Sequence, residues 1–445
     1  MLGYYFQLAF RNLRRNPGLT ALMIGAVALG IAVCVMTLTM YRAMSGNPIW
    51  WKNDVLFAVT LDAWDPNEPA NEDKPELPPW QLTYRDAMAL MESEIPDRTV
   101  IMHKAVGVLS VDDSTALPER VVTRVTSSDF FAIFDVPFQY GGGWTAEADR
   151  GPEPVIVLSR AMNDRYFAGE NSIGRRIRWE DREFRVIGVR DTWQPMPTFY
   201  DLNNGSLQES EDAYIPFGWN ATLELSSAGN TNGWKPQEVN TYLDFINSEN
   251  IWIQMWVELP DAASRQRMQA YIDGYALEQK KAGRFERPLN NRLTPVDQWM
   301  VDNDVVGNDD RVLVGLAFAF LAVCLLNTVG LLLAKFLNNA AITGVRRALG
   351  ASRRQVFMQH LVEVGVISSI GALAGLALGA LFLAGLRMLY TTDPTDLGGT
   401  QALAHVDIGS VVTALALALF ATIAAGLYPA WRIGRIPPAI YLKSQ

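Results

Sequence analysis

The sequence predicts an integral membrane protein with four transmembrane α-helices and a large extracytoplasmic α+β domain of two subdomains. Three observations predict this fold class. The 445 residues contain four apolar windows of membrane-spanning length. The long segment 42–311 separates the first window from the other three. The basic residues that flank the windows would all lie on the same side of the membrane. The two cysteines, Cys34 and Cys324, lie within apolar windows, so the segment between them must fold without a disulfide.

Each apolar window covers the roughly 20 residues that a helix needs to cross the hydrocarbon core. The windows run from about Leu19 to Tyr41, Val312 to Leu337, Leu361 to Tyr390 and Ile408 to Tyr428. The first is too long for a signal-peptide core, so we expect an uncleaved anchor. The predicted parts are an amphipathic N-terminal cytoplasmic helix (1–17), a first transmembrane helix (18–41), the outer domain (42–311, with a subdomain change near 151 and a return near 245), a second transmembrane helix (312–337), a cytoplasmic segment (338–360), a third transmembrane helix (361–390), a short outer loop (391–407), a fourth transmembrane helix (408–430) and a cytoplasmic tail (431–445).

The flanking charges predict the orientation of the chain in a bacterial inner membrane. Basic residues in short flanks face the cytoplasm. The loop 391–407 holds three aspartates and no lysine or arginine. Both termini and the connection between the second and third windows are therefore expected inside, and 42–311 outside. The basic residues are Arg11, Arg14 and Arg15 before the first window, Lys335, Arg346, Arg347, Arg353 and Arg354 between the second and third, and Arg432, Arg435 and Lys443 after the fourth.

The first residues of the chain predict an amphipathic helix on the inner leaflet. Apolar side chains recur there at helical spacing, opposite a face with Gln7, Arg11 and Arg14. The alternative is that this helix continues directly into the first window, although Pro17 favours a break. The apolar positions are Leu2, Phe6, Ala9, Phe10 and Leu13.

Small and polar residues in the windows indicate how the helices pack. Gly371, Gly375 and Gly379 recur every four residues, a spacing that allows a second helix to approach closely in lipid. The sequence leaves open whether that helix belongs to this chain or to a second copy. Asn327 lies near the middle of the second window, where we expect an interhelical hydrogen bond.

Glu363 is the one acidic residue of the third window. Ionisable residues within membrane helices are candidates for a functional role. Because Glu363 lies near the cytoplasmic end, it can reach water or pair with Arg353 or Arg354. A structural role and a proton relay therefore both remain open, and the first is favoured.

The segment 42–311 predicts a mixed order of helices and strands, which is typical of an α+β domain. A change in character near Gly151 suggests two subdomains. The expected strands are Val100–Val111, Arg120–Val125, Val155–Leu158, Ile251–Glu258 and a hairpin of Arg176–Trp179 with Phe184–Val189; the expected helices are Tyr84–Ile95, Ser127–Phe134, a helix capped by Ser159 that ends at Phe167, and Ala262–Gln279. The segment Pro195–Gly233 is rich in Asn, Ser and Gly and is expected to be mostly loop.

A search for catalytic or binding motifs finds none. No Gly-Lys pair occurs, so a Walker A phosphate loop is absent from the sequence. His103, His360 and His405 lack ligand spacing, and the acidic run 302–310 lacks the pattern of a calcium loop. The net charge of −9 argues against a nucleic-acid partner. We therefore expect no catalytic, cofactor-binding or metal-binding residue and do not expect an enzyme.

The segment Ala340–Gln355 reads A-A-I-T-G-V-R-R-A-L-G-A-S-R-R-Q. It resembles the signature of the MacB/FtsX superfamily of ABC transporter permeases (type VII). The C-terminal segment Ala425–Pro438 and the opening segment Ala9–Pro17 are also similar to family motifs. Within the outer domain, Pro154–Val189 resembles the MacB-like periplasmic core domain. The resemblance therefore extends along the whole chain.

This resemblance implies a permease subunit driven by a separate ABC ATPase subunit, which would bind ATP and Mg²⁺. It implies a dimer with a second permease, identical or different; the absence of an acidic residue before Ile342 is a departure that favours a heterodimer. A periplasmic adaptor and an outer-membrane channel are further partners that the resemblance leaves open. Export of a peptide, antibiotic, lipid or lipoprotein is expected, and the alternative is an FtsX-like signalling subunit. The implied ATPase-coupling residues are Gly344, Val345, Arg346, Arg347, Ala348, Leu349, Gly350, Ala351 and Ser352.

Overall fold

The computed structural model describes residues 2–112, 116–208, 210–338 and 340–390, together with residues 412, 413, 416, 420, 426, 427 and 429. The chain divides into two compact units. The helical unit contains the described residues of 1–43, 306–393 and 403–445, and the α+β unit contains those of 44–305.

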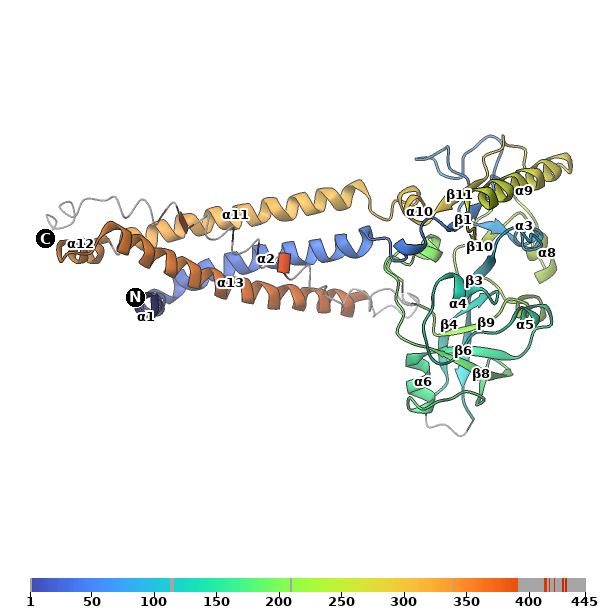
Figure 1. Cartoon of the computed structure of the whole chain (residues 1–445), viewed down its shortest axis with the longest axis horizontal. Helices are drawn as coiled ribbons and strands as arrows, with labels where there is room; N and C mark the ends of the chain where they lie inside the picture. Colours follow the sequence, from blue (N-terminus) through green and yellow to red (C-terminus); the bar gives the residue numbers. More distant parts are fainter. Residues whose placement is uncertain are drawn as a thin grey trace. The chain divides into compact units, whose positions relative to one another are not determined.

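Long helices form the helical unit (Figure 1). Three segments, Pro17–Lys52, Asp310–Asn338 and Arg353–Gly385, are long and apolar enough to cross a membrane. At about 1.5 Å per residue, each exceeds the thickness of the hydrocarbon core. The predicted fourth span, 408–430, lies largely outside the described residues. The helices are α1 (Leu2–Arg15), α2 (Pro17–Ser45), α11 (Asn308–Asn338), α12 (Ala340–Ala348) and α13 (Arg353–Tyr390).

A single residue, Asn16, separates α1 from α2. Asn16 lies between the helices, and its carbonyl accepts the backbone N–H of Thr20 at 3.1 Å. Asparagine is a preferred N-cap residue, and proline is favoured at the first position of a helix, which Pro17 occupies. The local sequence therefore explains why α1 ends and a new helix begins here.

The α+β unit is built on an 11-stranded mixed sheet within the described residues (Figure 1). Its main path runs β11-β1-β10-β3-β4-β9-β6-β8-β5; β2 pairs with β10, and β7 pairs with β3 and β8. The elements are η1 (Trp50–Lys52), β1 (Leu56–Thr60), β2 (Leu82–Thr83), α3 (Tyr84–Leu90), β3 (Arg98–Ser110), β4 (Glu119–Thr126), α4 (Phe130–Ile133), β5 (Phe138–Gly141), α5 (Ala146–Arg150), β6 (Val155–Ser159), α6 (Arg160–Phe167), β7 (Arg176–Trp179), β8 (Arg182–Arg190), η2 (Phe199–Asn204), β9 (Ala213–Pro216), α7 (Trp219–Thr222), α8 (Tyr242–Asn247), β10 (Ile251–Glu258), α9 (Ala262–Lys281), β11 (Arg292–Pro295) and α10 (Val296–Asp302).

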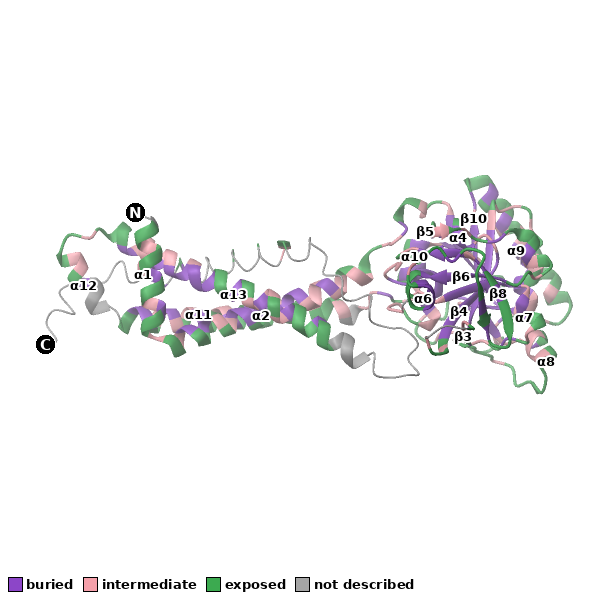
Figure 2. Ribbon diagram, turned by 90° about the horizontal axis from the view of Figure 1, so that it is seen from below, coloured by how far each residue is buried: buried purple, intermediate pink, exposed green. Residues whose placement is uncertain are grey.

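The central strands of this sheet, such as β1, β6 and β10, are buried on both faces, and Figure 2 shows buried residues in purple. Alternate residues of one strand enter different cores because successive side chains point to opposite sides. In β6, for example, Ile156 and Leu158 lie in the core that also contains residues of α6 and α9. Val155 and Val157 lie in the other core, with aromatic residues of α4 and η2. Continuous apolar runs in the sequence are therefore strands covered on both sides.

The prediction of two subdomains is not supported by this sheet, which continues across the expected boundary near Gly151. Strand β9 pairs in parallel with β4, from before that boundary, and antiparallel with β6, from after it. The described residues of 44–305 accordingly form one compact unit. A composition change near Gly151 marks the short helix α5 and the turn after it, and the pairing of distant strands joins the two halves.

Candidate functional site

The segment implied to couple to an ATPase forms the short helix α12 and the turn that leads into α13. On α12, Gly344 is buried, whereas Ala348 is exposed. The helix is followed by Gly350, whose φ of +103° is accessible to glycine at little cost. Ser352 then caps α13, because its hydroxyl accepts the N–H of Gln355 at 3.2 Å and the Gln355 side chain accepts the N–H of Ser352.

Two apolar side chains project from this segment into solvent. Val345 is 47 % exposed and Leu349 is 83 % exposed. Because they are four residues apart in a helical turn, they lie on the same side. Large apolar side chains at such exposure commonly mark a contact surface when they are adjacent. We call Val345 and Leu349 the apolar pair of α12.

Arg346 makes contacts inside the helical unit. Its guanidinium donates to Gln359 Oε1 of α13 at 2.8 Å and to the Tyr4 hydroxyl of α1 at 3.2 Å. The resemblance implied an ATPase-coupling role for Arg346, whereas these contacts connect α12 to α1 and α13. Arg347 and Ala351 are half-buried, and Gly350 is exposed.

The three glycines of α13 face α2 of the same chain. A Cβ at Gly371 would lie 2.8 Å from Val27 Cγ1, and one at Gly375 would lie 2.8 Å from the carbonyl oxygen of Ala28. At Gly379 the nearest atom would be 3.5 Å away, on Ala32. The sequence left the neighbouring helix open, and the structure identifies it as α2.

The polar residues of the windows lie in different surroundings. Asn327 is exposed on α11, and its side chain makes no hydrogen bond with a described residue, so an interhelical bond of Asn327 stays a prediction. Glu363 is only 1 % exposed and pairs with Lys335 Nζ of α11 at 2.8 Å. The expected partners, Arg353 and Arg354, are exposed instead. The prediction of an arginine partner was therefore wrong.

Sequence reasoning missed Lys335 as a site residue. In the sequence, Lys335 is one of the basic residues that flank the second window. The ammonium group of such a lysine usually extends to the membrane surface. The structure places Lys335 in the last turn of α11, where its side chain is fully buried. A lysine and a glutamate near the adjoining ends of two consecutive apolar helices were the available signal.

The α+β unit contains a larger cluster of buried charges. Arg124 of β4 pairs with Asp201 at 2.6 Å and also with Glu211, and Lys104 of β3 lies 3.3 Å from Asp201. Burial alone would raise the pKa of Asp201, but the two neighbouring cations lower it below its ordinary value. Asp201 also accepts from the Gln254 amide at 3.0 Å. Opposite charges are balanced here, which is typical of a structural network.

His103 lies beside this cluster and is fully buried. Its ring nitrogens lie 3.0 Å from the Lys104 carbonyl oxygen and 2.9 Å from Asn220 Oδ1. Burial lowers the pKa of His103 to about 4, and the positive charge of Arg124 adds to the decrease. The imidazole is therefore neutral at physiological pH.

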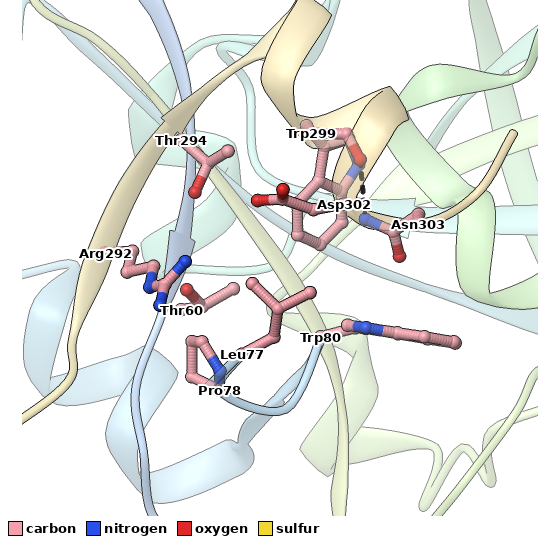
Figure 3. A pocket seen from close by; sticks show the side chains of 9 residues that line it. All are labelled: Thr60, Leu77, Pro78, Trp80, Arg292, Thr294, Trp299, Asp302 and Asn303. Atoms are coloured by element: carbon pink, nitrogen blue, oxygen red, sulfur yellow. Dashed lines mark hydrogen bonds between the residues drawn. The ribbon is translucent and has the colours of Figure 1, made fainter. Parts of the chain in front are cut away.

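One surface pocket of the α+β unit lies beside α10 (Figure 3). It is small and open to solvent, unlike the concave sites that bury most of a small molecule's surface. Asn303 Nδ2 donates to the Trp299 carbonyl oxygen at 2.8 Å in its wall. We assign no ligand to it. The lining residues are Thr60, Leu77, Pro78, Trp80, Arg292, Thr294, Trp299, Asp302 and Asn303.

The acidic run after α10 is engaged in local contacts. Asp304 pairs with Lys74 at 2.8 Å, and Asp302 accepts from Gln298 Nε2 at 2.6 Å. Among the residues that the structure describes, no group of three or more His, Cys, Asp or Glu side chains is arranged to hold a metal ion.

Comparison with protein families identifies both parts of the chain. Residues 20–275 match the MacB-like periplasmic core domain, and residues 314–438 match the FtsX-like permease C-terminal domain. The chain belongs to the MacB/FtsX family of ABC permeases. This family membership, predicted from the motifs of the sequence, is confirmed, as is a membrane protein with a large α+β domain of the MacB-like periplasmic class.

Individual MacB/FtsX relatives are distant in sequence. The pyoverdine export ATP-binding/permease protein PvdT of Pseudomonas syringae pv. tomato is 22 % identical over 99 % of this chain and 59 % of its own length. The macrolide export ATP-binding/permease protein MacB of Syntrophobacter fumaroxidans is 22 % identical over 72 % of this chain and 46 % of its own length. The chain thus spans about half the length of the curated relatives it matches.

Among solved structures, the periplasmic region of MacB from Actinobacillus actinomycetemcomitans is similar to 60 % of this chain and 95 % of that chain, at 13 % identity and a TM-score of 0.35. A likeness this weak adds nothing to the family assignment, which rests on the two matched domains.

Proposed function

We propose that the chain is the permease part of an ATP-driven exporter in a bacterial inner membrane. Two features support the proposal: the chain belongs to the MacB/FtsX family, and an amphipathic helix with an exposed apolar pair interrupts its long apolar helices. Four spans with both termini in the cytoplasm, as the flanking charges predict, would present that helix on the cytoplasmic side.

The partner in this proposal is an ABC ATPase subunit, which binds ATP and Mg²⁺ and docks on Val345 and Leu349. The apolar pair would enter a groove of the ATPase, as amphipathic helices do in other complexes. Burial of one leucine side chain contributes about 1.5–3 kcal/mol, so removal of the Leu349 side chain should weaken this contact measurably. This chain itself would bind no cofactor, and the hydrolysis would occur on the partner.

The substrate class proposed is a peptide, antibiotic, lipid or lipoprotein that is handled outside the membrane. Relatives are named for export of macrolides and of pyoverdine, and this favours export over an FtsX-like signalling role. A second permease, identical or different, completes the complex. An adaptor and an outer-membrane channel are further proposed partners in a double-membrane envelope.

The observation that carries the proposal is the exposure of Leu349, and a photo-cross-linking experiment tests it. p-Benzoylphenylalanine replaces Leu349 in one variant and Leu117, an exposed leucine of the α+β unit, in a control. After irradiation of intact cells, mass spectrometry identifies the cross-linked peptides. We expect position 349 to react with a nucleotide-binding domain that carries a Walker A sequence, and position 117 not to do so. A reaction at 117, or none at 349, would contradict the proposed docking.

A further inference from the structure

Lys335 and Glu363 form a buried ion pair inside the helical unit. Their charged groups are 2.8 Å apart, and both side chains are at most 1 % exposed. Asn12 of α1 donates to the second carboxylate oxygen of Glu363 at 3.2 Å, and Thr20 Oγ1 of α2 lies 3.5 Å from Lys335 Nζ. Four helices, α1, α2, α11 and α13, therefore meet at one polar cluster, which we call the charge clamp.

Most described side chains around the charge clamp are apolar. Leu332 and Phe336 of α11 and Val364 and Ile367 of α13 are buried beside it. Among the described residues, His360 is the other titratable group that faces the pair, with Nδ1 3.7 Å from Glu363 Oε2 and its ring 4.2 Å from that of Phe336. In so apolar a setting, separation of two opposite charges is strongly opposed, so the pair resists any change that moves its helices apart.

Stability alone does not account for such a pair. Apolar residues of similar volume are often as stabilising as a buried ion pair, or more so, because desolvation of the charges is costly. A buried ion pair can instead add specificity, because each charge has a defined partner whereas apolar contacts are non-directional. The charge clamp therefore fixes the register of α11 against α13.

The two residues of the charge clamp lie on either side of α12 in the sequence. Lys335 lies in the last turn of α11, before α12 begins at Ala340. Glu363 lies about three turns into α13, on the other side of α12. The ion pair thus closes the loop from α11 through α12 to α13. A force applied to α12 would reach both long helices together.

We propose that Lys335 and Glu363 are positioning residues that make α11 and α13 move as one body when the docked ATPase displaces α12. This inference rests on the proposed function. Neither residue contacts the ATPase: both are buried, whereas the docking contact belongs to the exposed apolar pair. Without the charge clamp, α11 and α13 would move independently when α12 is displaced.

Electron–electron distance measurements on the full complex in nanodiscs test the charge clamp. Spin labels replace Leu326 of α11 and Leu373 of α13, both exposed, in a chain in which Cys34 and Cys324 are alanine. Distances are recorded without nucleotide and with ATP plus vanadate. The test variant is Lys335→Met with Glu363→Leu, which removes both charges and leaves none unpaired. The control is the reversed pair, Lys335→Glu with Glu363→Lys.

We expect a narrow distance distribution in the unmodified chain, the same with and without ATP plus vanadate. The apolar double variant should broaden the distribution without nucleotide and shift it with ATP plus vanadate, and the reversed pair should restore the narrow distribution. Circular dichroism confirms equal helicity, so that broadening does not reflect unfolding. A narrow, unshifted distribution in the apolar variant would overturn the inference, as would a reversed pair that behaves like the apolar one.

Failure of the proposed function has a different signature. In that case no nucleotide-binding domain cross-links to position 349, and ATP plus vanadate changes nothing in any variant. The difference in width between the unmodified chain and the apolar variant without nucleotide would persist, because it depends on the charge clamp alone.

Discussion

The two units of the chain both bury opposite charges, but in different surroundings. In the α+β unit, Arg124 pairs with two carboxylates, and the side-chain amides of Asn204 and Gln254 donate to Asp201. In the helical unit, the carboxylate of Glu363 pairs with Lys335, accepts from the Asn12 amide and lies 3.7 Å from His360 Nδ1. The first network is embedded in a sheet with apolar cores on both faces, whereas the second joins helices that pack through small residues.

This difference follows from the medium that each unit requires. In water, burial of apolar area drives folding, and the large aromatic cores of the α+β unit can offset the cost of a buried charge network. In lipid that driving force is absent between helices, and close packing of small residues replaces it. Few charged side chains are then buried between the helices, and each is paired with a particular residue of another helix. We therefore expect the α+β unit to depend on its charge network for stability, and the helical unit to depend on its glycines.

The largest effect is expected from Arg124→Met in the α+β unit. This substitution leaves Asp201 and Glu211 buried without their main cation, and loss of one partner of a buried pair typically costs about 3–5 kcal/mol. Urea unfolding of the detergent-solubilised chain, followed by tryptophan fluorescence, measures the change. Arg176→Met is the matched control, because Arg176 pairs with Glu183 on the surface and the loss should stay within about 0.5 kcal/mol. Equal losses in both variants would show that the buried network does not stabilise the unit.

A smaller effect is expected from acid, through His103. Its pKa is about 4 in the folded protein, against about 6.5 in an unfolded chain. Between these values the unfolded state binds a proton that the folded state does not, so stability falls as the pH decreases from about 6.5 to about 4. The full loss is about 3 kcal/mol for a difference of this size.

The variant His103→Gln isolates this contribution. Glutamine can retain a hydrogen bond in place of the imidazole, and it does not titrate. Urea midpoints measured at several pH values between 4 and 6.5 should therefore fall less steeply in the variant than in the unmodified chain. Carboxylates contribute the same background slope to both. Parallel slopes would mean that His103 is protonated in the folded protein across this range.

Local signals in the sequence predicted much of the fold. The prediction of β10 from its β-branched and aromatic run was confirmed at Ile251–Glu258, and the hairpin of β7 and β8 and the Ser159-capped helix α6 were also confirmed. Strand β9 was not predicted, because Ala213–Pro216 lies in a loop-rich segment and becomes a strand only by pairing with β4 and β6. Pairing between distant segments leaves no local pattern.

The candidate site divides in the same way. The resemblance implied that residues 344–352 couple to an ATPase, but the exposure of Leu349 and the inward contacts of Arg346 depend on how α1 and α13 pack around this segment. The glycine spacing of α13 predicted close packing without naming α2 as the neighbour. Lys335 and Glu363 were visible as charges, but a pairing between residues in different helices needs the tertiary structure.

The smallest predicted loss of stability, which concerns the helical unit, is expected from a substitution of Gly375. A leucine there would place its Cβ 2.8 Å from the Ala28 carbonyl oxygen and 2.9 Å from Ile31 Cβ, so α13 and α2 must separate. Overpacking of this kind costs about 1–3 kcal/mol. Gly365 of the same helix is the matched control, since a Cβ there meets nothing within 4 Å. Gly365→Leu should be neutral or stabilise the helix by up to about 1 kcal/mol.

Unfolding by SDS in mixed micelles, followed by circular dichroism, compares the stability of the Gly375→Leu and Gly365→Leu variants. If Gly375→Leu proved as stable as Gly365→Leu, the contact between α13 and α2 would not hold the helical unit together, and its stability would have to come from the charge clamp and the other helix contacts.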